Sequence, residues 1–232
     1  MSNLPYDDLS SYHFCIRIAV TGTTPKCGKS SILSSFCYSK SIADNPELSS
    51  LSSNAVYLSY QPHQLDIPNA TTNLHRFEYY ELPNPNASPS PNPNSKILSH
   101  LFSSLSGIVF VVDLTNHHCL ESLADLIKTY VQHPYQRYVV LCSKSDSKDK
   151  AVTKDDVIMA CDDVASGSRV LVEEVSVFEN SNVFDSLIAL QSQILDDLRR
   201  SDLGKTDLYF RGIKIGPEQW KIEEILEGVV EL

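Results

Sequence analysis

The segment GIVFVVDL, residues 107–114, is the feature that most limits how this chain can fold. It is apolar almost throughout, and strands with such a continuous pattern are buried on both faces, as in the centre of a parallel sheet. Shorter runs of the same character lie at 14–20, 138–143 and 169–176, and apolar residues recur at helical spacing between them. Because parallel strands need crossover connections, the sequence predicts an α/β fold.

We expect a three-layer, mostly parallel sheet of about six strands, with helices on both faces. Segments 55–60 and 73–82 are rich in aromatic and branched residues and are separated by turn-forming residues, which favours an antiparallel pair. Helices are expected at 30–40, 120–130, 157–164 and 184–198. Between the second strand of the pair and the central strand lies PNPNASPSPNPNS, residues 83–95, whose composition predicts a mobile, extended loop.

Composition and charge exclude several classes of function. The formal net charge of −10 disfavours a general affinity for nucleic acid or for an anionic membrane. The first residues have no apolar signal core, no stretch has the apolar length of a membrane span, and no C-terminal cysteine allows prenylation. The six cysteines contain no CxxC pair, which favours buried thiols in a reducing compartment. These features predict a cytoplasmic protein without a direct membrane anchor.

The sequence TGTTPKCGKSS, residues 21–31, joins the first apolar run to the first helix. A strand that turns into a helix N-terminus directs several backbone N–H groups at one point, which suits phosphate. In the pattern Gly-x4-Gly-Lys-Ser/Thr, the lysine reaches the outer phosphates and the hydroxyl binds Mg²⁺. Counted back from Gly28, Thr23 stands at the first glycine position and Gly22 lies one residue earlier, so either a residue is inserted or a threonine occupies a turn that favours glycine. Pro25 removes one N–H donor. We expect phosphate contacts from Thr23, Pro25, Lys26, Cys27, Gly28, Lys29, Ser30 and Ser31, with Ser30 as the Mg²⁺ ligand.

The alternative interpretation of this loop is that Gly28-Lys29-Ser30 only begins a helix.

The triplet His117-His118-Cys119 also suggests metal ligands, but adjacent side chains point in divergent directions and no second cluster completes a site. We therefore expect no metal there.

A second motif, Ser143-Lys144-Ser145-Asp146, follows the apolar run 138–143. Here the sequence resembles the Ras/Rab-like small GTPases, whose guanine-reading motif is Asn-Lys-x-Asp after the fifth strand. The resemblance implies that Asp146 accepts hydrogen bonds from guanine N1 and N2 and that Lys144 lies along the base. Ser143 replaces the asparagine that ties this loop to the phosphate loop, so reduced affinity is expected. The segment VEEVSVFENSNVFDSL, residues 172–187, resembles the family's last strand and Ser-Ala-Lys loop, which implies that Ser176 and Val177 lie near the base, with Phe178 in place of the lysine.

The resemblance fails at the hydrolysis machinery. The family's Asp-x-x-Gly-Gln corresponds to residues 81–85, where Glu81 remains a candidate to reach Mg²⁺ through water. Asn84 replaces the glycine that meets the γ-phosphate, and Pro85 replaces the glutamine that orients the attacking water. The first switch, residues 41–54, has no threonine, and the choice among Ser49, Ser50, Ser52 and Ser53 stays open. The protein is then at most a slow GTPase, and no catalytic residue is assigned.

The resemblance divides the chain into an N-terminal extension at 1–13, a small GTPase-like P-loop domain at 14–199 and a tail at 200–232. The tail begins with strand-like alternation and continues as an acidic amphipathic helix, which either packs on its own domain or docks a partner. The leading hypothesis is a GTP/GDP- and Mg²⁺-binding protein with weak or absent hydrolysis that acts in intracellular transport. Protein partners are expected at loops 41–54 and 83–95 and at residues 213–232.

The main alternative is a pseudo-GTPase scaffold or adaptor that binds no nucleotide. Pro25 and Lys26 discriminate between the two, because a loop that folds them into the phosphate position favours the scaffold. A third class, a P-loop kinase or ATPase, is disfavoured because it needs no guanine reader such as Asp146 and because the sequence shows no arginine-rich lid.

Overall fold

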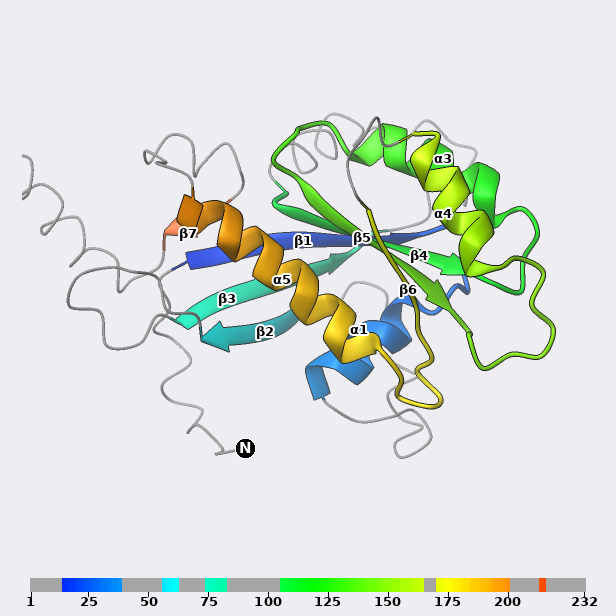
Figure 1. Cartoon of the computed structure of the whole chain (residues 1–232). Coiled ribbons are helices and arrows are strands. Elements are labelled where there is room, and N and C mark those ends of the chain that lie inside the picture. The colour runs from blue at the N-terminus through cyan, green and yellow to red at the C-terminus, as the bar shows by residue number, and fades with distance from the viewer. Residues whose placement is uncertain are drawn as a thin grey trace, which may run out of the picture.

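The structure is a computed structural model that describes residues 14–38, 56–62, 74–82, 105–164, 170–200 and 213–215 (Figure 1). Its strands are β1 (Phe14–Gly22), β2 (Val56–Pro62), β3 (Leu74–Glu81), β4 (Gly107–Asp113), β5 (Arg137–Ser143), β6 (Leu171–Glu174) and β7 (Ile213–Ile215). Its helices are α1 (Lys29–Tyr38), α3 (Cys119–Tyr130), α4 (Lys154–Asp162) and α5 (Val183–Arg200). The predicted N-terminal extension, the loops 41–54 and 83–95 and the predicted tail helix lie outside the described residues.

The sheet has the strand order β2-β3-β1-β4-β5-β6, with β7 paired to β1. Strands β3, β1, β4, β5 and β6 run parallel to their neighbours. The α/β class with a parallel sheet is thereby confirmed. The predicted antiparallel pair is also present, since β2 pairs with β3 from Val56 opposite Tyr80 to Pro62 opposite Leu74.

Alternating side chains of β1 explain where the core sits. Ile16, Ile18 and Val20 belong to one buried cluster together with residues of α1 and α5. Ala19 belongs to a second cluster, together with residues of α3 and α4. Successive side chains of a strand point to opposite faces, so the two clusters lie on opposite sides of β1. All seven residues of β4 are buried, as the continuous apolar pattern predicted.

The element boundaries differ from the predictions by a few residues. Strand β6 is four residues long, shorter than the predicted strand at 169–176. Helix α4 ends at Asp162, so Val164 lies beyond it, half-buried against the second cluster. This helix begins with a capping box, in which Thr153 accepts from the backbone N–H of Asp156 while the Asp156 carboxylate accepts from the N–H of Thr153.

The strand predicted at the start of the tail is present as β7. It runs antiparallel to the beginning of β1, with Phe14 opposite Ile215 and Ile16 opposite Ile213. The side chain of Ile213 is buried in the first cluster. Residues beyond position 200 therefore contribute a strand to the sheet.

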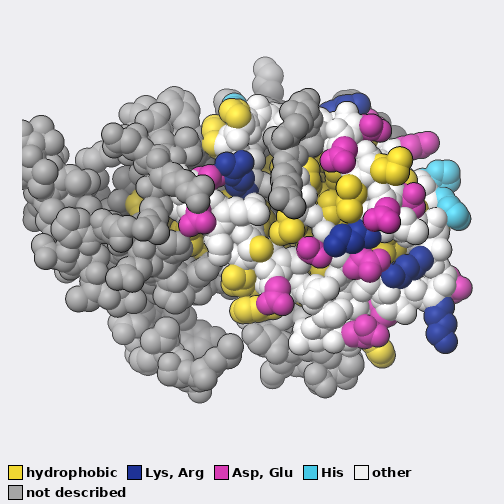
Figure 2. Space-filling model, in the orientation of Figure 1, with side chains coloured by type: hydrophobic (Ala, Val, Ile, Leu, Met, Phe, Trp, Pro, Cys, Tyr) yellow, Lys and Arg dark blue, Asp and Glu magenta, His cyan; other side chains and the backbone are white. Residues whose placement is uncertain are grey.

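The described part of the face shown in Figure 2 is mixed in charge. On the face shown in Figure 2, acidic and basic side chains are interspersed over the described part of the chain. All six cysteines are free thiols, and five of them are buried. Within the described ranges, no helix is both long enough and apolar enough to cross a bilayer.

Candidate functional site

The loop between β1 and α1 is anchored to β4 by a backbone hydrogen bond. The N–H of Thr23 donates to the carbonyl of Val111 at 3.0 Å, which anchors the first residue of the loop. At the other end Gly28 has a φ of +98°, in the left-handed region that favours glycine. The Gly28 carbonyl accepts from the N–H of Ile32 at 2.9 Å, so the helix begins directly after this turn. The strand–turn–helix required for a phosphate loop is thus present.

Gly22, which precedes the standard position of the first glycine, is required here by packing. A Cβ at this position would lie 2.2 Å from Sγ of Cys27 and 3.0 Å from the carbonyl oxygen of Val111. The thiol of Cys27 therefore folds back onto the end of β1 and is buried. Burial raises the pKa of the Cys27 thiol, outweighing the nearby Lys29 ammonium, so the thiol stays neutral at physiological pH.

The remaining side chains of the loop divide into buried and exposed ones. Thr23 is buried and its hydroxyl points to the carbonyl of Val111 at 3.5 Å, whereas Ser31 is half-buried. Pro25 and Lys26 are exposed.

Lys29 and Ser30 both contact Glu81, the last residue of β3. The Ser30 hydroxyl donates to Oε2 of Glu81 at 2.7 Å, and Nζ of Lys29 lies 3.9 Å from Oε1. The Lys29 and Glu81 side chains are only 5% and 8% exposed, so this is a buried ion pair. The two residues that the sequence analysis assigned to phosphate and Mg²⁺ therefore lie side by side around one carboxylate.

The oxygen atoms of Ser30 and Glu81 suit Mg²⁺, which binds to proteins through one or two oxygen ligands plus phosphates and water. Among the residues described, no group of three or more His, Cys, Asp or Glu side chains is placed to hold a metal. In the triplet at 117–119, the two histidines are exposed whereas Cys119 is buried, so these side chains point apart.

Ser143, at the end of β5, joins the loop between β1 and α1 to the second motif, residues 143–146. Its hydroxyl lies 2.7 Å from the carbonyl oxygen of Cys27 and 3.0 Å from that of Val112. The side chain is buried, and its single proton is shared between the two acceptors. A contact between the second motif and the loop after β1 is therefore present with serine in place of asparagine, because the shorter side chain still reaches the Cys27 carbonyl.

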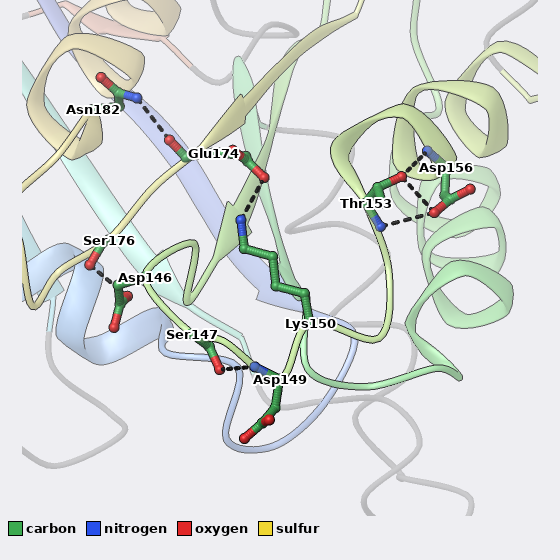
Figure 3. Close-up of polar contacts among 9 residues, drawn as sticks. All are labelled: Asp146, Ser147, Asp149, Lys150, Thr153, Asp156, Glu174, Ser176 and Asn182. Carbon is green, nitrogen blue, oxygen red and sulfur yellow. Dashed lines mark hydrogen bonds and ion pairs between the residues drawn. The ribbon is translucent and has the colours of Figure 1, made fainter.

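Asp146 and Ser176 come together from the loops that follow β5 and β6 (Figure 3). The Ser176 hydroxyl donates to Oδ1 of Asp146 at 2.6 Å and accepts from the N–H of Glu179 at 3.0 Å. The N–H of Ser145 also donates to the carbonyl of Val175 at 3.3 Å. These bonds fix the Asp146 carboxylate near the surface, with Val177 half-buried and Phe178 69% exposed on the same loop.

Lys144 is held by a residue that the sequence analysis missed. Its Nζ lies 2.5 Å from Oδ2 of Asp113, the last residue of β4, which faces Ser143 in the strand register. The other oxygen of Asp113 accepts from the N–H and the hydroxyl of Thr115. Burial acts to raise the pKa of Asp113, but the hydrogen bonds from Lys144 and Thr115 outweigh it and hold the pKa below its ordinary value. The available signal was an acid ending an otherwise apolar strand.

The loop that carries Lys144 and Asp146 is also held at its C-terminal end, by contacts of residues 150–152. Lys150 Nζ contacts Oε1 of Glu174 at 3.1 Å, and the Asn182 side chain donates to the Glu174 carbonyl at 3.0 Å (Figure 3). The N–H groups of Ala151 and Val152 both donate to the carbonyl of Leu114. The loop is therefore tied to Leu114, the residue that follows β4, and to Glu174 at the end of β6.

The fold and the loop geometry define an α/β protein whose architecture is compatible with the P-loop GTPase class. No protein-family model matches the sequence, and no curated protein is significantly similar to it.

Proposed function

We propose that this protein binds guanine nucleotides in the manner of an atypical Ras/Rab-like small GTPase. The observation that carries the proposal is the hydrogen bond from the Ser143 hydroxyl to the Cys27 carbonyl. This bond brings the two sequence motifs into direct contact, although the two bonded residues are 116 positions apart in the chain. A nucleotide needs both parts at once, because the phosphates and the base are opposite ends of one ligand.

Each part has the chemistry that its proposed role requires. The N-terminus of α1 and Lys29 supply N–H groups and positive charge for the phosphates. Ser30 supplies an oxygen ligand for Mg²⁺, and Glu81, which accepts from Ser30, would reach the ion through water. Asp146 supplies carboxylate oxygens for N1–H and the N2 amino group of guanine, oriented by Ser176. Lys144, Ser176 and Val177 lie on the two loops that would border the base.

The proposal includes weak or absent hydrolysis of GTP. It rests on Asn84 and Pro85, which lie outside the described residues. Proline has no side-chain group to orient water, so GTP would stay bound longer than in a Ras-like enzyme with glutamine there. The protein would then act in intracellular transport through contacts with protein partners, at loops 41–54 and 83–95 and at residues 213–232.

A second candidate function, a scaffold that binds no nucleotide, is favoured by a different observation. The cationic groups that would meet the ligand already have acidic partners, since Lys29 pairs with Glu81 and Lys144 with Asp113. A nucleotide would have to compete with the first of these pairs for Lys29. If these two ion pairs serve only to stabilise the fold, the protein needs no nucleotide at this site.

Calorimetric titration with GTP, GDP and ATP in the presence of Mg²⁺ tests the proposal. The protein should bind GTP and GDP but not ATP, and Lys29→Ala should abolish the binding. Lys128→Ala is the matched control, because it removes an exposed lysine of α3 and changes the net charge by the same amount. No heat with any nucleotide from the folded protein would favour the scaffold.

A further inference from the structure

Both carboxylate oxygens of Glu81 contact the two side chains to which the proposed function assigns the nucleotide phosphates and Mg²⁺. One oxygen accepts from Ser30 at 2.7 Å, and the other lies 3.9 Å from Nζ of Lys29. A carboxylate that binds a lysine ammonium and a serine hydroxyl at a helix N-terminus makes the same kinds of contact as a phosphate group.

The backbone holds Glu81 at this position. Glu81 faces Val20 in the parallel register of β1 and β3, and the N–H of Leu82 donates to the Val20 carbonyl at 2.8 Å. The side chain is thus directed from a fixed strand end toward the loop that begins three residues after Val20.

We propose that Glu81 is an internal competitor for phosphate, which occupies the loop of the nucleotide-free protein and is displaced when a ligand binds. This inference rests on the proposed function, since it names how that same site is regulated. Lys29 is almost fully buried, and a buried ammonium without an anionic partner is costly, so Glu81 stabilises the nucleotide-free protein. The same negative charge opposes an incoming anion.

The competition should be strongest for an anion that brings no metal. A divalent cation that arrives with a nucleotide supplies positive charge that the Glu81 carboxylate can face. Pyrophosphate without metal has only Lys29, Ser30 and backbone N–H groups to bind, and Glu81 holds the two side chains already. The carboxylate therefore makes the loop selective against free phosphates.

The test is a calorimetric titration with inorganic pyrophosphate in EDTA, on the full chain and on Glu81→Gln. The amide keeps an acceptor for the Ser30 hydroxyl and removes the charge. We expect Glu81→Gln to bind pyrophosphate about tenfold more tightly than the natural protein, or better, because the opposing charge lies close to the site. Glu173→Gln is the control, since it makes the same change in net charge at a surface ion pair with Lys154. Its affinity should equal that of the natural protein.

Glu81→Asp is the second variant, in case the amide unfolds the protein. The shorter acid keeps the charge but loses reach, so its pyrophosphate affinity should lie between those of the natural protein and Glu81→Gln. Equal affinity in all folded variants, or no binding by any of them, overturns the inference. If the natural protein still prefers GTP to ATP, the proposed function survives that result. Tighter pyrophosphate binding by Glu81→Gln without any preference for guanine supports the inference and removes the proposed function.

Discussion

The hydroxyl of Ser143 lies 2.7 Å from the carbonyl oxygen of Cys27, and this contact joins the end of β5 to the loop that follows β1. A second acceptor, the Val112 carbonyl at 3.0 Å, brings in the end of β4. The ends of β4 and β5 and the loop that follows β1 therefore meet at one buried hydroxyl. They meet beyond the carboxyl ends of the parallel strands, where α/β proteins bind their ligands.

Ser143→Ala should loosen this junction. It removes a buried donor shared by two carbonyls, so the free energy of unfolding should fall by about 1–2 kcal/mol. Urea denaturation followed by circular dichroism measures the change. Ser147→Ala, which removes a hydroxyl nearer the surface of the same loop, should stay within about 0.5 kcal/mol of the natural protein. Equal losses of unfolding free energy in the two variants would show that the buried Ser143 hydroxyl stabilises the fold no more than an ordinary surface hydroxyl does.

Asp146→Asn should change which base is bound. The asparagine keeps Oδ1 as an acceptor for the Ser176 hydroxyl, so the loop should stay in place. It replaces the other carboxylate oxygen by an N–H₂ donor, which opposes the N2 amino group of guanine and suits the O2 carbonyl of xanthine. Calorimetry should show weaker GTP binding and a gain of XTP binding. Unchanged GTP binding without any gain of XTP binding would place Asp146 outside the base site.

Asp113→Asn should lower stability in a pH-dependent way. The pKa of Asp113 is held below its ordinary value of 3.8 by Lys144 and Thr115, so the carboxylate stabilises the fold above that pH. Lys144 is 42% exposed, and we therefore expect a modest loss at pH 7, about 1–2 kcal/mol. The difference should shrink as the pH falls through 3.8 and below, where the natural protein protonates Asp113 as well. Urea denaturation of both proteins between pH 3 and pH 7 measures it. A difference that stays constant over this range would mean that charge is not the cause.

Thr153→Ala should weaken the start of α4. It removes the hydroxyl that accepts from the Asp156 N–H at 3.2 Å, at a cost of about 1 kcal/mol in the free energy of unfolding. Thr129→Ala is the matched control, because Thr129 is exposed near the end of α3 and its hydroxyl donates only to the Asp125 carbonyl of the preceding turn. A larger loss at Thr129 than at Thr153 would contradict the role of the cap.

The elements of this fold could be predicted because their signals are local. The seven buried residues of β4 and the recurrent apolar residues of α3 carry their own periodicity, and the β2–β3 pair follows from two neighbouring strand-like segments. The predicted ends of β6 and α4 were less accurate, because caps and strand register decide where these elements end, and hydrophobicity does not.

The site was predictable only in its parts. Lys29, Ser30, Lys144 and Asp146 stand out by motif, but their partners depend on strand ends that are far apart in the sequence. Asp113 was missed because an acid at the end of an apolar strand does not show which residue it pairs with until the neighbouring strand is known. The Ser143 contact was missed for a related reason, because side-chain length alone does not show how closely two loops approach.

The pairing of β7 with β1 has a consequence for handling the protein. Because Phe14 lies opposite Ile215, the chain enters β1 and leaves β7 at neighbouring points. Strand β1 then runs for eight residue steps, roughly 26 Å, before it reaches the phosphate loop. Attachment of a label or a solid support next to Phe14 or Ile215 would therefore place it at the opposite end of β1 from the loop that carries Lys29.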